Sequence, residues 1–311
     1  MIEPLSFAAR AMGGRLIVHL AADAADAERA RRDAGRAMAR MGRWADRLSR
    51  HLETSELSRL NASPAASIVV RPTLAAALLA GQAAGRATGG LVDVALLDAR
   101  LAAEAPVTRS VAPSVPRTWS VTRGRHAGAS VDRSPGLRFD LDGIAKGWLA
   151  DRALRLLDPW TTAVVDADGD LAVRCASGHH WAIAIDDPRV AGTTLAILYL
   201  EAPDDAWPTR WGVATSGVSV HRWVDDGRVR HHIIDPRTGT PAVTDVVQVT
   251  VVSRSAVEAE GLAKAAVILG LADGFALLER AGVAGAVVLT DRGETLALPS
   301  TLALLDEPAA A

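Results

Sequence analysis

The hydrophobic and polar positions follow two patterns along the chain. Apolar residues at helical spacing predict helices, and short apolar runs predict strands. Apolar residues at helical spacing, bounded by capping residues or glycine, predict helices at residues 23–50, 73–86, 144–157, 255–269 and 271–281. Short apolar runs bounded by Gly, Asp and Pro predict strands at residues 15–20, 139–141, 163–165, 171–174, 181–185, 195–200, 211–214, 246–252 and 286–290.

The order of these elements predicts one domain. Residues 105–135 are rich in Pro, Ser and Arg, and we expect an irregular connection or a hairpin there. No internal repeat and no obvious linker interrupts the pattern. We therefore expect a single α+β domain over residues 1–311, with mixed or antiparallel sheets and packed helices.

The composition indicates a folded protein and limits the classes of partner that it is expected to bind. With 311 residues, of which 49% are hydrophobic, the chain can bury a substantial core. Its formal net charge of -2 gives no overall attraction to nucleic acid, so no nucleic acid partner is expected. No membrane span is expected either. The single cysteine, Cys175, excludes an internal disulfide and a multi-thiolate metal site, and we expect it to be a small buried side chain.

Residues 231–239, His-His-Ile-Ile-Asp-Pro-Arg-Thr-Gly, place an acid/base pair, a carboxylate and a guanidinium in one short segment. Ile233 and Ile234 predict a strand, and Asp-Pro followed by Gly predicts a sharp turn, so the histidines are expected where a strand meets a loop. This combination suits chemistry on an anionic ligand. The segment alone fits equally well a structural turn in which Asp235 caps its own backbone.

Lysine occurs at only two positions, Lys146 and Lys264, although the chain contains 34 Lys and Arg residues. Lys146 falls in the first turn of the helix expected at 144–157, where backbone N–H groups and the helix dipole favour anions. A compact ammonium at that place is well suited to bind a phosphate. The alternative is a solvated helix lysine.

Four further segments carry polar residues in a distinctive order: 55–61 (Ser-Glu-Leu-Ser-Arg-Leu-Asn), 88–93 (Thr-Gly-Gly-Leu-Val-Asp), 140–147 (Asp-Leu-Asp-Gly-Ile-Ala-Lys-Gly) and 214–217 (Ala-Thr-Ser-Gly). Together with residues 231–239, their order and spacing resemble the ApbE family, the FAD:protein FMN transferases. The resemblance implies an ApbE-like, T-fold-related fold. It also implies an enzyme that breaks the diphosphate of FAD, releases AMP and joins FMN through a phosphoester to a Ser or Thr of a partner flavoprotein.

The resemblance assigns roles to single residues. His232 is the candidate base, because an imidazole has an unperturbed pKa of about 6.5, near working pH. His231 is its incidental neighbour, and Lys146 is the candidate phosphate ligand. The residues expected to bind the cofactor are Met12, through its sulfur on the isoalloxazine ring, and Ser58, Asn61, Asp93, Lys146, Ser216, Gly217, Arg222, Asp235 and Thr238.

Three positions depart from the family pattern. The family has Asp and Thr where Glu260 and Lys264 stand, and the resemblance implies that these two, with the backbone carbonyl at Ala145, hold magnesium. A charged lysine has no lone pair to offer a metal. One hypothesis is that Lys264 projects into the metal position, pairs with Glu260 and contacts a phosphate; the alternative is that it points to solvent. Asp168 replaces a glycine, which accepts a positive φ more readily.

These departures leave two functions open. The first is an FAD:protein FMN transferase, and the second is an ApbE-like protein that binds FAD without transferring FMN. The first residues show no secretion signal and no lipobox cysteine, whereas many ApbE-type relatives are exported lipoproteins. We therefore expect a cytoplasmic protein, or alternatively an exported lipoprotein whose leader has been removed.

Overall fold

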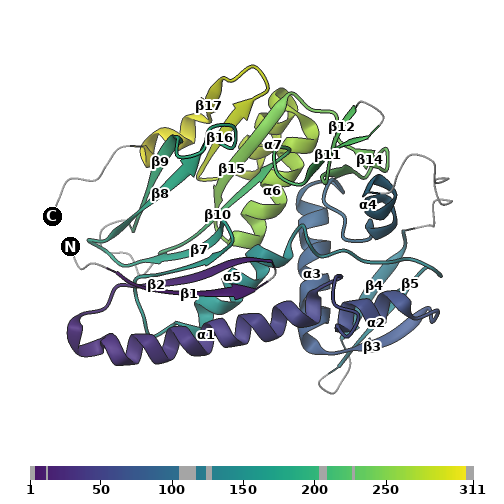
Figure 1. Ribbon diagram of the computed structural model, residues 1–311, viewed down its shortest axis with the longest axis horizontal. Helices are drawn as coiled ribbons and strands as arrows, with labels where there is room; N and C mark the ends of the chain where they lie inside the picture. Colours follow the sequence, from purple (N-terminus) through teal and green to yellow (C-terminus); the bar gives the residue numbers. More distant parts are fainter. Residues whose placement is uncertain are drawn as a thin grey trace.

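An eight-stranded antiparallel sheet forms the centre of the computed structural model (Figure 1). The structure describes residues 4–11, 13–104, 117–123, 128–202, 209–225 and 228–305. In spatial order, the strands of the sheet are β1 (Leu5–Ala11), β2 (Gly14–Leu20), β6 (Ala163–Ala167), β7 (Asp170–Cys175), β10 (Thr209–Gly217), β15 (Val246–Ser253), β16 (Gly285–Thr290) and β17 (Thr295–Ala297). All their pairings are antiparallel, which confirms the expected α+β class with antiparallel sheets.

Helices cover one face of this sheet, and a hairpin covers part of the other. Helix α5 (Ala145–Leu156) packs on β6 and β7, and α6 (Ala256–Leu269) packs on β10 and β15. Helix α1 (Ala27–Leu48) packs along α5 (Figure 1). The hairpin of β8 (His180–Asp186) and β9 (Thr194–Glu201) closes a smaller apolar cluster around Val164, Val173 and Val213.

A three-stranded sheet and the helices around it form a second region, at the right of Figure 1. Its elements are α2 (Glu56–Ala62), β3 (Ser67–Val70), α3 (Pro72–Ala87), α4 (Leu97–Glu104), β4 (Trp119–Arg123) and β5 (Ala129–Arg133). Helix α3 packs on α6 and α1, so one apolar cluster containing Leu78, Val131 and Leu149 joins the two regions. The remaining elements are η1 (Ala24–Asp26), β11 (Arg222–Asp225), β12 (Arg228–His231), β13 (Ile234–Asp235), β14 (Thr240–Pro241), α7 (Leu271–Ala281) and η2 (Pro299–Leu304).

The five expected helices are confirmed as α1, α3, α5, α6 and α7, but two local expectations are wrong. Residues 139–141 form no strand; the backbone of Phe139 is held instead by the Asn61 side chain. For residues 55–61, which follow the helix expected at 23–50, the sequence pattern predicts a helix end and loop, but they mostly form helix α2. This helix begins because the Ser55 hydroxyl accepts a hydrogen bond from the backbone N–H of Ser58 at 2.8 Å.

No chemical motif surrounds Trp44, Trp148 or Trp181, so the sequence predicts them, like Cys175, in the interior; Trp148 and Cys175 are buried, whereas Trp44 and Trp181 are partly buried. Trp44 and Trp148 pack edge to face with ring centroids 6.0 Å apart. Cys175 is fully buried. Trp181 is only partly buried and packs against the smaller cluster under the β8–β9 hairpin. Among the helices that the structure describes, none combines the length and the apolar character needed to cross a membrane.

The departure at Asp168 is accommodated by a tight turn between β6 and β7. Ala167 pairs with Asp170, so Asp168 and Gly169 alone connect the strands, with φ values of 59° and 93°. Asp is among the residues that accept a positive φ at modest cost, and Asp-Gly is typical of this two-residue turn. The Asp168 carboxylate also accepts a hydrogen bond from the backbone N–H of Arg15 at 3.2 Å. The fold therefore tolerates the missing glycine.

Helices α5 and α6 meet closely at the first turns of both helices. The Asp151 carboxylate of α5 accepts hydrogen bonds from the backbone N–H groups of Ala256 and Val257, at 2.9 and 3.1 Å, and so caps α6. Gly147 lies against the same turn: a Cβ added there would stand 2.6 Å from the backbone carbonyl of Ala256. Gly147 therefore sets the spacing of the two helices.

We expect Gly147→Ala to lower the free energy of unfolding by about 1–3 kcal/mol, because the methyl group meets backbone that cannot move independently. The matched control is Gly35→Ala in α1, where nothing lies within 4 Å of the added Cβ. That change should stabilise the protein by up to about 1 kcal/mol, the helix propensity difference. Urea unfolding of both variants measures the two effects, and equal effects would contradict the close approach.

Candidate active site

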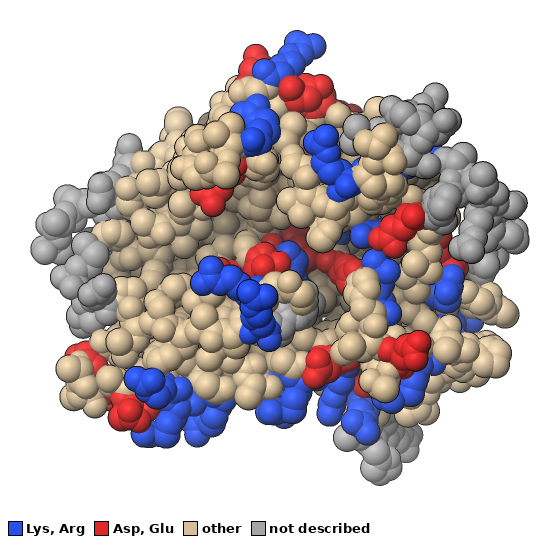
Figure 2. All heavy atoms as spheres, viewed as in Figure 1, with Lys and Arg blue, Asp and Glu red and all other residues tan. Residues whose placement is uncertain are grey.

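A pocket opens where α4, the bend after α3, the start of α5, residues 232–234 and α6 meet. The free space at this pocket, counted together with the open solvent at its mouth, is about 560 Å³, of which only a small part is enclosed. Its titratable lining residues are Asp93, Arg100, Asp140, Asp142, His232 and Lys264. Acidic and basic side chains also lie together in the hollow near the centre of the face shown in Figure 2. Charged groups of both signs can thus meet one ligand in this pocket.

His232 lies in the bend between β12 and β13, where a strand meets a loop as expected. It lines the pocket, its Nδ1 is buried without a hydrogen-bond partner, and its ring lies edge to face with the ring of His221, with centroids 5.3 Å apart. Burial and the charges of Lys264 and Arg100 lower the pKa of His232 to about 3. The ligand-free imidazole is therefore neutral at physiological pH and able to accept a proton.

His231 points into a different environment. It is buried, its Nε2 bonds the backbone carbonyl of Ala242 at 2.9 Å, and the N–H of Ile233 donates to its Nδ1 at 3.3 Å. Both ring nitrogens are occupied by the backbone. The structure thus gives His231 a structural role and leaves His232 for the pocket.

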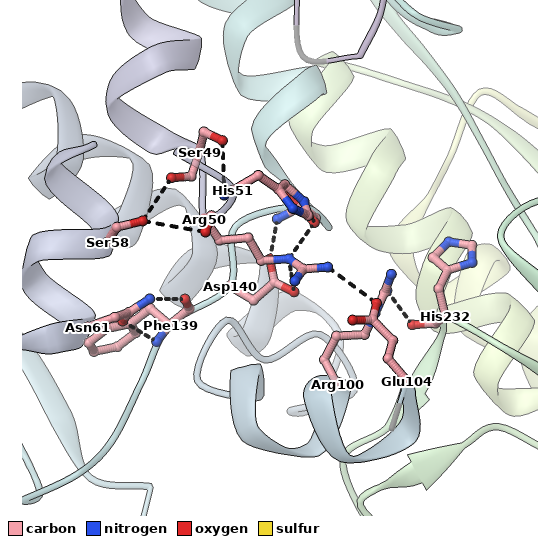
Figure 3. Close-up of polar contacts among 11 residues, drawn as sticks. Ser49, Arg50, His51, Ser58, Asn61, Arg100, Glu104, Phe139, Asp140 and His232 are labelled. Atoms are coloured by element: carbon pink, nitrogen blue, oxygen red, sulfur yellow. Dashed lines mark hydrogen bonds and ion pairs between the residues drawn. The ribbon is translucent and has the colours of Figure 1, made fainter. Parts of the chain in front are cut away.

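A chain that begins with a hydrogen bond at the His232 carbonyl and continues through ion pairs runs into the second region (Figure 3). Arg100 donates from Nη1 to the His232 carbonyl at 2.7 Å and from Nε to Glu104 at 2.5 Å. Arg50, only 9% exposed, donates to Glu104 at 3.3 Å and to Asp142 at 2.9 Å, and lies 3.5 Å from Asp140. Two carboxylates of the pocket wall are therefore fixed by one buried guanidinium.

Asp140 and Asp142 have pKa values shifted in opposite directions, and the contacts of Arg50 contribute to the difference. Burial and the charge of Asp142 raise the pKa of Asp140. Burial also raises the pKa of Asp142, but the hydrogen bond and charge of Arg50 outweigh burial and leave it below its usual value. Asp142 is therefore the carboxylate that carries negative charge most persistently.

Two of the expected cofactor-binding residues support the pocket wall from behind. Asn61 accepts from the N–H of Phe139 and donates to its carbonyl, each at 2.8 Å, next to Asp140 (Figure 3). The Ser58 hydroxyl is 3.4 Å from the carbonyls of Ser49 and Arg50. Neither residue lines the pocket. Both hold the segments that carry Arg50 and Asp140.

Lys146 lies in the first turn of α5, as expected, but turns toward the β6–β7 turn. Its Nζ is 3.4 Å from the Asp170 carboxylate and 3.4 Å from the Asp168 carbonyl. Asp170 is fully buried, and burial raises its pKa to about 6, with the Lys146 charge opposing that rise. Lys146 itself is 31% exposed and does not line the pocket.

Glu260 and Lys264 do not fit a magnesium site. The Glu260 carboxyl is buried, accepts from the N–H of Gly147 at 2.9 Å, and has its pKa raised to about 8 by burial and the charge of Asp170. An ammonium offers no lone pair, and Ala145 supplies only a backbone carbonyl. Across the described residues no group of three or more His, Cys, Asp and Glu side chains is arranged to hold a metal ion.

The expected pairing of Lys264 with Glu260 is an attraction at a distance. Burial lowers the pKa of Lys264 and raises that of Glu260, and the charge of each group opposes the shift of the other; the two groups form no ion pair within 4.0 Å. Lys264 lines the pocket rather than pointing to bulk solvent. The first half of the sequence hypothesis, an ammonium projecting into the site, agrees with this position.

The other expected residues are distributed as follows. Asp93 lines the pocket and pairs with Arg117 at 3.5 Å. Ser216 and Gly217 end strand β10, and Arg222 is exposed on β11, none of them lining the pocket. Asp235 is held by Arg237, which lowers its pKa, and Thr238 lies in the same turn, so Asp235 forms a turn and does not orient His232. Met12 lies outside the described residues.

Several residues of the site had not been assigned a role from the sequence. Asp140 and Asp142 belong to the motif at residues 140–147. Their position just before the expected start of a helix is the sequence feature that could have identified them as site residues. Arg50 is the last residue of the helix expected at residues 23–50. Arg100 belongs to α4, a helix that the sequence pattern did not predict. Their roles depend on contacts between distant segments: Arg50 with Glu104 (54 positions), Arg50 with Asp142 (92 positions) and Arg100 with His232 (132 positions).

The model of the ApbE family matches residues 12–288. The FAD:protein FMN transferase of Treponema pallidum is 35% identical over 170 residues, covering 50% of this chain and 45% of that protein. That of Vibrio cholerae is 34% identical over 149 residues, covering 47% and 42%. The matched segments thus span less than half the length of these relatives.

Solved structures match along nearly the whole chain. The apo crystal structure of the Pseudomonas stutzeri flavinyl transferase ApbE has a TM-score of 0.78 and 25% identity, with 99% of this chain and 98% of that chain covered. The ApbE protein of Thermotoga maritima has a TM-score of 0.80 and 23% identity, with 98% and 100% covered. The fold is therefore the one these structures share.

Proposed function

Because this chain belongs to the ApbE family, we propose that it is an FAD:protein FMN transferase. In the proposed reaction a Ser or Thr hydroxyl oxygen of an acceptor protein attacks the FMN phosphorus of FAD. The new P–O bond forms as the P–O bond to AMP breaks, AMP leaves with the bridging oxygen, and the hydroxyl proton goes to a base. The products are AMP and an acceptor that carries FMN as a phosphoester.

The observation that carries this proposal is the pocket that gathers His232, Arg100 and Lys264. Phosphoryl transfer depends mainly on positioning and on cations that offset the charge of the phosphate oxygens. A neutral imidazole and two cationic side chains on one pocket wall supply a proton acceptor and that charge. The names of the aligned relatives, FAD:protein FMN transferase, agree with this chemistry.

We assign the proton to His232. Its low pKa makes the ligand-free imidazole a weak base, but a bound diphosphate brings negative charge beside the ring and raises that pKa. The base thus becomes stronger when the substrate is in place. Asp93 belongs to the same wall and can orient the incoming hydroxyl.

Lys146 is proposed as a second phosphate ligand. Its two contacts, to Asp170 and to the Asp168 carbonyl, are both 3.4 Å long, and its side chain is 31% exposed. The ammonium can therefore turn toward a phosphate without losing a short hydrogen bond. Ser216, Gly217 and Arg222 stay candidates for the part of FAD that extends beyond the pocket.

The second candidate function is binding of FAD without transfer. The observation that favours it is the pair Glu260 and Lys264, whose groups do not fit a divalent cation. In that case the pocket would hold a flavin nucleotide but lack the charge stabilisation that transfer requires.

Incubation with FAD and an acceptor flavoprotein distinguishes the two functions. We expect flavin fluorescence on the acceptor band of a denaturing gel, together with release of AMP in equal amount. Replacing the target Ser or Thr of the acceptor by Ala is the control and should abolish the label. Tight binding of FAD with no label and no AMP would support the second function, and failure to bind FAD would contradict both.

A further inference from the structure

The ammonium of Lys264 occupies a defined place at the start of α5. A Cβ added to Gly143 would stand 1.8 Å from Lys264 Nζ, so the ammonium fills the space that any side chain at position 143 would take. Gly143 and Lys264 line the same pocket. The Lys264 side chain therefore extends from α6 across to the turn before α5, where its ammonium lies against Gly143.

This ammonium has unused hydrogen-bond capacity. Lys264 makes no hydrogen bond and no ion pair within 4.0 Å of any residue that the structure describes. The carboxylates that attract it are engaged elsewhere: Asp140 and Asp142 lie at Arg50, and Glu260 accepts from the N–H of Gly147. An ammonium has three donors, and no described residue accepts a hydrogen bond from that of Lys264.

Such a position is typical of a binding group rather than of a structural one. A lysine that only stabilised the fold would pair with one of the three carboxylates that its charge reaches. Lys264 instead stands partly buried at a pocket wall, where charge-assisted hydrogen bonds are strong because water is partly excluded.

We propose that Lys264 is a built-in cation that binds the diphosphate of the ligand directly, so that binding requires no divalent metal ion. The proposal rests on the proposed function for the identity of the ligand, FAD, but it concerns any diphosphate in this pocket. Glu260, which does not fit a metal, then serves as a buried hydrogen-bonding partner of α5.

The test is a titration of FAD, followed by quenching of flavin fluorescence, in EDTA and in magnesium. The wild-type dissociation constant should agree within about twofold in the two buffers. Lys264→Met should bind FAD about 10- to 100-fold more weakly in both, the loss expected for a charge-assisted hydrogen bond. The double variant Glu260→Asp, Lys264→Thr, which restores the carboxylate and the hydroxyl that the family resemblance implies for magnesium, should bind weakly in EDTA and regain affinity in magnesium.

Two controls keep the test decisive. Arg36→Met removes a positive charge from a side chain that is 81% exposed on α1 and should leave the FAD dissociation constant unchanged. Thermal melting of the Lys264 variants establishes that they are folded. Wild-type affinity in Lys264→Met, or more than tenfold weaker wild-type binding in EDTA, would overturn the proposal.

Inorganic pyrophosphate separates this inference from the proposed function. If FAD fails to bind but pyrophosphate raises the wild-type melting temperature in EDTA, and not that of Lys264→Met, the built-in cation stands and the flavin assignment fails. If FAD binds and is transferred only with magnesium, the flavin assignment stands and the built-in cation fails. If neither compound acts in EDTA, the built-in cation is overturned.

Discussion

His232→Asn is expected to reduce the rate of flavin transfer by about 10²- to 10⁴-fold, the usual contribution of a positioned general base. Asparagine has a similar size but no group that accepts a proton at neutral pH, while the His232 carbonyl that receives Arg100 is retained. FAD binding should therefore change little. Single-turnover labelling of the acceptor, with the FAD dissociation constant measured in parallel, separates the two quantities.

The neighbouring histidine provides the matched control. His231→Asn should leave the buried carbonyl of Ala242 without its partner and lower the free energy of unfolding by about 1–3 kcal/mol. The folded fraction should still transfer flavin at a rate close to that of the wild type. Wild-type transfer by His232→Asn, or a larger loss for His231→Asn, would contradict the assignment of the base.

The pH profile gives a second readout of the same residue. A base must be neutral to act, so activity is present above its pKa and lost as the pH falls through it. With a pKa of about 3 in the ligand-free protein, His232 should impose no acid limb on kcat/KM between pH 5 and 7. An acid limb in kcat would report the higher pKa of the bound complex. An acid limb in kcat/KM near pH 6.5 that disappears in His232→Asn would contradict the low pKa.

Arg50→Met is expected to lower the free energy of unfolding by about 3–5 kcal/mol, the cost of removing one partner from a buried ionic group. Arg50 is 9% exposed and lies within 3.5 Å of Glu104, Asp140 and Asp142. Without the guanidinium, these three carboxylates lose the cation that they share. Urea denaturation at neutral pH measures the loss.

The control for Arg50 is a surface arginine in the same helical region. Arg36 pairs with Asp33 but is 81% exposed, so Arg36→Met should change the free energy of unfolding by no more than about 0.5 kcal/mol. The Arg50→Met deficit should also shrink as the pH falls and the carboxylates become protonated. A deficit below 1 kcal/mol at neutral pH would mean that the carboxylates separate without cost.

Periodicity predicted the regular part of this fold well because long amphipathic segments leave a strong pattern. The helix expected at 144–157 and the strand expected at 15–20 agree with α5 and β2 within one residue at each end. Strand β1, the helix α4 and the short hairpin β11–β12 were not predicted, because their patterns are too short to distinguish from loops. The strand and turn expected from Ile233 to Gly239 agree with β13 and the turn that leads to β14. Residues 139–141 were expected to form a strand. The hydrogen bonds that a neighbouring strand would make with Phe139 are made instead by the side-chain amide of Asn61.

Site residues could be predicted from the sequence only where they belong to a short motif that contains chemically reactive or charged side chains. The choice of His232 over His231 came from its motif position, and the structure separates the two by their ring contacts. Asn61 was predicted to bind the cofactor, and in the structure its side chain holds the backbone of Phe139. Arg50 and Arg100 could not be found from local sequence, because each is one arginine among many until the chain folds. The direction of Lys146, toward Asp170, likewise depends on a turn that lies 22 residues away in the sequence.

The placement of both lysines at the site has a practical consequence. Since every other basic side chain apart from the histidines is an arginine, a reagent that acylates ε-amines can modify side chains only at positions 146 and 264. Peptide mass spectrometry of the acylated protein would then report the accessibility of two site positions without any engineered label. Occupancy of the pocket thus becomes measurable in the unaltered protein, through the protection of one amine relative to the other.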